Sequence, residues 1–188
     1  GPEARALAGE GGAPGEDGYQ YADYANGLAA LKRGDSAGAA KHLTEIQRSH
    51  RDQLTTAKPG DPGAVVVPVI LAWSLEAEIL AASGRFTEAV AILQRATALE
   101  DGMPEEFGPP AVVVPSHESL GGLYLRSGQP ALATQQFIRA LELGPGRSRA
   151  LAGLARAAKL TGNNALATQA TAALRRNWHR ADVDVPVP

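Results

Sequence analysis

The chain has 188 residues and a formal net charge of −2, so no overall electrostatic field directs it toward nucleic acid or a membrane surface. It contains no cysteine, which excludes disulfides, thiolate nucleophiles, iron–sulfur clusters and cysteine-ligated zinc. Alanine and leucine dominate, aromatic residues make up only 5%, and this composition favours helices over strands. No run of about 18 apolar residues occurs, so we expect no membrane span.

The first 18 residues, rich in Gly, Glu and Ala, are expected to form a tail. The opening pair Gly1-Pro2 is typical of the scar left by tag cleavage. On that expectation the natural N-terminus is missing, together with any signal peptide or anchor. The sequence therefore leaves the cellular compartment open.

Four pairs of helical segments follow, and we expect them to form antiparallel hairpins within one helical domain over residues 19–178. The expected hairpins span about 19–56, 66–100, 116–143 and 148–178. Residues 58–64 (KPGDPGA) predict a linker, because Pro and Gly interrupt helices. Residues 101–115 contain four prolines and predict an extended insert, because a residue before proline avoids the α region. The last ten residues, 179–188, predict a non-helical tail.

The third pair carries a set of regularly placed small, aromatic and turn residues. The set is Leu120, Gly121, Tyr124, Gly128, Ala133, Phe137, Ala140 and Pro145. The small residues let paired helices approach closely, and Tyr124 and Phe137 are expected to fill the space between hairpins. Gly128 can adopt the left-handed conformation that ends a helix. In these positions residues 114–147 resemble the tetratricopeptide repeat family, with His117 where that family usually has Trp.

Equivalents of Gly128 occur in the other three pairs, at Gly34, Gly84 and Gly162. The fourth pair follows the third at the usual repeat length of roughly 34 residues, whereas the first two pairs fit only with gaps. The resemblance implies an all-α solenoid of about four antiparallel hairpins, modified by the proline-rich insert. It also implies that the first helix of each hairpin lines a concave, protein-binding face.

A second resemblance concerns residues 105–121 (EEFGPPAVVVPSHESLG), which are similar to a segment of uncharacterised bacterial tetratricopeptide proteins. Two later segments, GLARAA at 153–158 and WHRAD at 178–182, fit the same group. The resemblance covers about residues 70–182. Those proteins often carry Lys just before the second proline, where this chain has Val114. This second resemblance implies a bacterial origin and no established activity.

The expected concave face collects tyrosines at one end and basic residues at the other. Its candidate partner-binding residues are Tyr21, Tyr24, Glu78, Glu118, Arg126, Arg149, Arg156 and Lys159. Seven basic and no acidic residues lie between Arg147 and Arg180, and forked guanidinium groups bind carboxylates well. We therefore expect a protein or peptide partner with an acidic segment. The alternative is a solvated basic face, and a nucleic-acid partner would need a larger basic surface.

The pair His117-Glu118 allows a second hypothesis. With Glu78 nearby, the pair offers a divalent metal site or an acid–base pair, and the chain is then a metal- or small-ligand-binding accessory protein using residues 101–118. The simpler interpretation is that Ser116 caps the helix, Glu118 favours its N-terminus and His117 packs inside.

No HExxH, Walker or GxSxG motif occurs, so we expect no catalytic residue and no cofactor. The sequence thus favours a non-catalytic protein-interaction module over an enzyme. A domain that mainly associates with itself is a third alternative.

Overall fold

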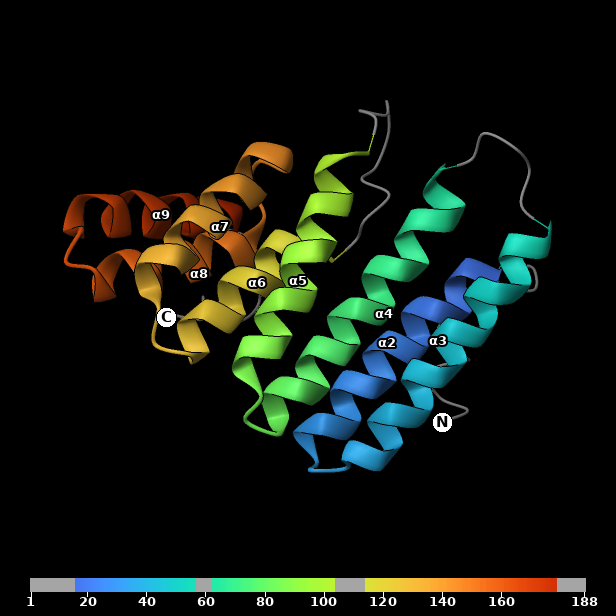
Figure 1. The fold of residues 1–188 in the computed structure, drawn as a ribbon. Helices are drawn as coiled ribbons and strands as arrows, with labels where there is room; N and C mark the ends of the chain where they lie inside the picture. Colours follow the sequence, from blue (N-terminus) through green and yellow to red (C-terminus); the bar gives the residue numbers. More distant parts are fainter. Residues whose placement is uncertain (1–15, 57–61, 104–113, 179–188) are drawn as a thin grey trace. The chain divides into compact units, whose positions relative to one another are not determined.

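The structure is a computed structural model, and it describes residues 16–56, 62–103 and 114–178 (Figure 1). All regular structure in these ranges is helical, which confirms the all-α prediction. The helices are α2 (Glu16–Lys32), α3 (Ser36–Thr56), α4 (Pro62–Ala82), α5 (Phe86–Asp101), α6 (Ser116–Arg126), α7 (Pro130–Leu143), α8 (Ser148–Leu160) and α9 (Asn164–Asn177). None of the described helices combines the length and apolarity needed to cross a membrane.

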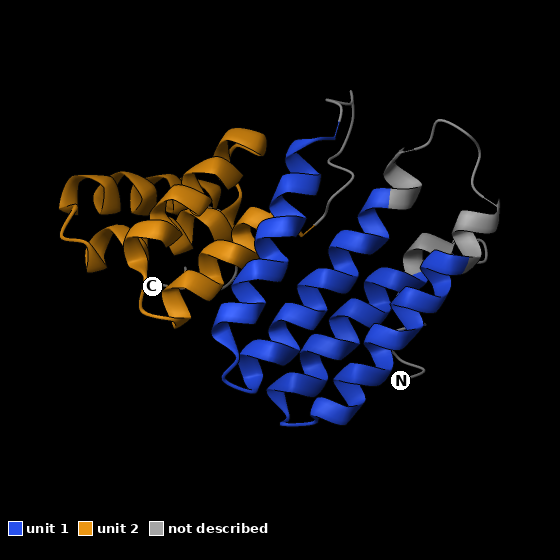
Figure 2. Ribbon diagram, in the orientation of Figure 1, with its two compact units in different colours: residues 1–112 blue, residues 113–188 orange. Residues whose placement is uncertain are grey.

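The chain divides into two compact units, residues 1–112 and residues 113–188 (Figure 2). In the first unit consecutive helices of α2–α5 pack in order, and the first helices of its two hairpins, α2 and α4, also touch. The second unit repeats this arrangement with α6–α9, in which α6 touches α8. The division falls between the second and third hairpins, within the segment that the sequence predicts to be a proline-rich insert.

The four hairpin turns share one backbone design. Each contains a glycine with positive φ: Gly34 (77°), Gly84 (77°), Gly128 (75°) and Gly162 (76°). In each turn the residue after the glycine donates its N–H to the carbonyl five residues earlier: Asp35 to Ala30, Arg85 to Leu80, Gln129 to Tyr124 and Asn163 to Ala158, at 2.8–2.9 Å. This bond satisfies a carbonyl at the helix end, and it requires a left-handed residue that glycine adopts at low cost. The predicted equivalence of the four glycines is confirmed.

Glycines inside the helices allow close contact between hairpins. A Cβ at Gly121 of α6 would lie 2.9 Å from Cε1 of Phe137, and one at Gly153 of α8 would overlap the same ring. Phe137 of α7 therefore fills the space between its own hairpin and the next, as the sequence predicted. In the first unit Gly27 of α2 allows the same kind of close contact between hairpins, because a Cβ there would lie 2.6 Å from Cδ2 of Leu75 on α4.

Two expected boundaries differ from the structure. Helix α4 begins at Pro62, inside the linker predicted over residues 58–64, because proline suits the first turn of a helix, where its missing N–H costs little. Helix α2 begins at Glu16, inside the predicted tail. Most of the predicted extended insert (residues 104–113), the tail 179–188 and residues 1–15 lie outside the described residues.

Candidate functional site

The candidate residues of the first unit lie on its first helices, Tyr21 and Tyr24 on α2 and Glu78 on α4. Tyr24 is only 7% exposed, so its ring belongs mainly to the packing between helices. Tyr21 and Glu78 are half-buried and present part of their side chains to solvent. This end of the predicted face therefore offers one tyrosine and one carboxylate rather than a pair of exposed tyrosines.

In the second unit the candidate basic residues lie on α6 and α8 and are all exposed: Arg126, Arg149, Arg156 and Lys159. The opposite flank of α8 is buried by Ala150, Leu151, Leu154, Ala155, Ala157 and Ala158. Because these apolar residues fix the rotation of α8, its cations point outward. Within the part of the chain that the structure describes, the three cations of α8 form no ion pair.

The charge of the chain is divided unevenly between the two units. Residues 113–188 contain nine Lys and Arg against four Asp and Glu, a formal charge of +5. Residues 1–112 contain nine Lys and Arg against sixteen Asp and Glu, a formal charge of −7. Although the overall charge is −2, the second unit is basic, and it carries the exposed cations of α8.

Glu118 lies inside the second unit. It is 5% exposed, and its Oε1 accepts a hydrogen bond of 2.6 Å from Nε of Arg147. Arg147 is the N-cap residue of α8, so this ion pair connects the start of α6 to the start of the next first helix. The carboxylate of Glu118 is engaged within the protein, which favours a structural role over contact with a partner.

His117 is also buried, at 5% exposure, and its Nδ1 lies 2.8 Å from Oε1 of Gln136 on α7. The ring packs within its own hairpin, in agreement with the simpler interpretation. The expected helix cap differs, because the N-cap position of α6 is Pro115 rather than Ser116.

The metal-site alternative gains no support. No group of three or more His, Cys, Asp or Glu that could hold a metal ion occurs among the residues that the structure describes. Glu78, the third proposed ligand, belongs to the other unit, and Glu118 already binds Arg147.

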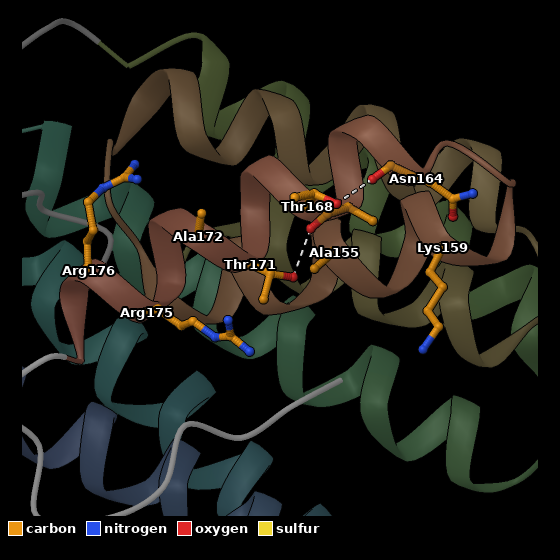
Figure 3. Close-up of a pocket in the computed structure, with 9 residues that line it drawn as sticks. Ala155, Lys159, Asn164, Thr168, Thr171, Ala172, Arg175 and Arg176 are labelled. Atoms are coloured by element: carbon orange, nitrogen blue, oxygen red, sulfur yellow. Dashed lines mark hydrogen bonds between the residues drawn. The ribbon is translucent and has the colours of Figure 1, made fainter.

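A hollow of about 650 Å³, which the sequence did not predict, lies between α8 and α9 (Figure 3). It is lined by Ala155, Lys159, Asn164, Ala167, Thr168, Thr171, Ala172, Arg175 and Arg176. One signal was present, since Thr171 stands one repeat length after Phe137. A small side chain where the previous repeat has a ring indicates unfilled space.

The fold has known counterparts. Two similar solved structures are both described as crystal structures of MamA. One has a TM-score of 0.51 and 16% identity and covers 82% of this chain and 95% of MamA. The other has a TM-score of 0.50 and 15% identity and covers 90% of this chain and 98% of MamA. The fold is of the tetratricopeptide type.

The tetratricopeptide-type fold rests on the structural likeness and on the repeated turns together. No protein-family model matches the chain, and no curated protein is significantly similar to it in sequence. The resemblance of residues 105–121 to uncharacterised bacterial proteins stays a prediction, because most of that segment lies outside the described residues.

Proposed function

We propose that this protein is a non-catalytic interaction module that binds a protein or peptide along the first helices of its tetratricopeptide-type hairpins. The observation that carries the proposal is the exposed row of cations on α8, Arg149, Arg156 and Lys159, in a unit with a formal charge of +5. Helical solenoids commonly bind partners across such extended surfaces. Arg126 of α6 completes the proposed contact set of the second unit. Tyr21 and Glu78 form a separate candidate set on the first helices of the first unit.

The spacing of the cations suggests the form of the partner. Arg149 and Arg156 are seven residues apart on one helix face, which corresponds to about 10 Å along the axis. A polyproline-type peptide rises about 3.1 Å per residue and presents every third side chain on one side, about 9 Å apart. A peptide with acidic residues at every third position therefore matches the two guanidinium groups.

Two of the predicted partner-binding residues, Tyr24 and Glu118, are too deeply buried to belong to the contact set. Tyr24 is 7% exposed and Glu118 is 5% exposed and bound to Arg147. We assign both to packing within their units. Replacing either is expected to change stability more than partner affinity.

The proposal is tested on an array of fluorescent peptides with and without regularly spaced acidic residues. Reversing Arg149, Arg156 and Lys159 to Glu is expected to weaken binding of the acidic peptides at least about tenfold, because attraction becomes repulsion. The matched control reverses the exposed residues Lys32, Arg33 and Lys41, which changes the net charge equally in the other unit.

Circular dichroism checks that both variants keep the helical content of the unaltered chain. If the α8 variant binds every acidic peptide as tightly as the control variant does, the assignment of the binding face to α8 is wrong.

A further inference from the structure

The hollow between α8 and α9 lies where the preceding hairpin holds an aromatic ring. In the third hairpin Phe137 lies against Gly121 and against Gly153 of the next first helix. One repeat length later, the equivalents of Gly121, Ala133 and Phe137 are Ala155, Ala167 and Thr171. All three of these later residues line the hollow.

Thr171 cannot fill the space that a ring would occupy. Its hydroxyl donates a hydrogen bond of 2.8 Å to the carbonyl of Ala167 in its own helix, as Figure 3 shows. The neighbouring wall consists of small side chains, since Ala155 and Ala172 also line it. The volume of about 650 Å³ falls within the roughly 300–1,000 Å³ of pockets that take ligands.

Cations stand at both ends of this hollow. Lys159 and Asn164 line one end, and Arg175 and Arg176 line the other (Figure 3). Asn164 and Arg175 are eleven residues apart on α9, or about 16 Å. No acidic residue occurs in α8 or α9.

The charges replace apolar residues of the preceding repeat. Lys159 stands at the position of Leu125, and Arg175 at that of Leu141. A terminal repeat needs a polar outer face to stay soluble. That need explains the charges, but it does not explain a hollow with small, partly apolar walls.

We propose that this hollow docks a segment of a partner protein in which one aromatic side chain is flanked by acidic residues on both sides. The aromatic side chain takes the place that Phe137 holds in the preceding hairpin, and the carboxylates meet Lys159 at one end and Arg175 at the other. An extended segment advances about 3.3 Å per residue, so five residues span the hollow. The site goes beyond the proposed binding face and shares only Lys159 with it.

The probe is a synthetic pentapeptide with two acidic residues on each side of a phenylalanine, titrated into the full chain by calorimetry. Replacing its phenylalanine with alanine is expected to weaken binding at least about tenfold, because burying an aromatic ring is a large part of such an affinity. Equal affinity of the two peptides would overturn the proposal.

The chain variant Thr171→Phe places an aromatic ring in the hollow, at the position that Phe137 holds in the preceding hairpin. It is expected to keep its helical content and to lose at least about tenfold in affinity for the pentapeptide. An unchanged affinity would overturn the proposal. Arg149→Glu with Arg156→Glu should weaken binding of the phenylalanine and alanine pentapeptides by the same factor, whereas Thr171→Phe should weaken binding of the phenylalanine pentapeptide alone, which separates this site from the proposed binding face.

A second variant keeps the test decisive if Thr171→Phe does not fold. Reversing Arg175 and Arg176 to Glu is expected to lower the affinity for the pentapeptide at least about fivefold. The matched control reverses Lys32 and Arg33, two adjacent exposed cations at the end of α2. Equal loss in both variants would contradict a local site.

Two other occupants are outcomes of the same experiment. The chain itself contains Glu105, Glu106 and Phe107. If the pentapeptide binds a Phe107→Ala chain but not the unaltered chain, the chain's own segment is the occupant, and the partner proposal is wrong. If light scattering shows concentration-dependent association that Thr171→Phe abolishes, a second copy is the occupant, with the same consequence.

Discussion

At the scale of single residues, the hairpin turns depend on glycine for a conformational reason alone. Gly128 has a φ of 75°, and a Cβ added there would meet nothing within 4 Å. Gly128→Ala is therefore expected to destabilise the protein by about 1–2 kcal/mol, the cost of a left-handed conformation for an L residue. Chemical denaturation measures this change.

The control for that substitution lies six residues earlier. Gly122 is inside α6, and a Cβ there also meets nothing within 4 Å. Gly122→Ala is expected to stabilise the protein by about 0.5–1 kcal/mol, because alanine has the higher helix propensity. Two glycine-to-alanine changes in one hairpin thus have opposite signs. Destabilisation by both would show that crowding, and not backbone conformation, governs these sites.

Single residues also show where sequence reasoning ends. The turn glycines and Phe137 were predictable because the repeat gives each of them one position with one physical task. The pairing of Glu118 with Arg147 was not, since the two residues are 29 positions apart and no local rule relates them. Consequently the sequence predicts Glu118 as a partner-binding residue, although its carboxylate is buried in the structure.

At the scale of elements, the contact between α7 and α8 depends on complementary sizes at Phe137 and Gly153. Gly153→Ala is expected to destabilise the second unit by about 1–3 kcal/mol, because the added methyl overlaps the ring. Phe137→Ala should cost about 3–5 kcal/mol through the cavity that it leaves.

The double variant tests the contact itself. With the ring removed, Gly153→Ala should no longer destabilise and should gain from its helix propensity, so the two effects are strongly non-additive in denaturation experiments. Additive effects would mean that Gly153 is glycine for a reason other than Phe137.

The sequence predicts which segments are helical more accurately than it predicts where each helix begins and ends. A new helix begins shortly after the left-handed glycine in all four hairpins. The start of α4 differs from the expected one because proline both breaks a helix interior and suits the first helical turn. Pro62 takes the second role, and the sequence KPGDPGA alone gives no reason to prefer it.

At the scale of the whole molecule, charge distribution decides how an acidic partner responds to salt. If the overall charge of −2 governed binding, an acidic peptide would be weakly repelled, and added salt would strengthen the complex. If the second unit governs binding, its charge of +5 attracts the peptide, and salt weakens the complex. The sign of the salt effect therefore distinguishes the two cases.

We expect the affinity for acidic peptides to fall at least about fivefold between 0.05 and 0.5 M NaCl, measured by fluorescence titration, because the screening length shortens to a few ångströms. The variant with Arg149, Arg156 and Lys159 reversed to Glu should lose this dependence, since the attractive charges facing the peptide are gone. The variant with Lys32, Arg33 and Lys41 reversed should retain it. An affinity that rises with salt in the unaltered chain would contradict binding through the basic unit, because only a repulsive field is relieved by screening.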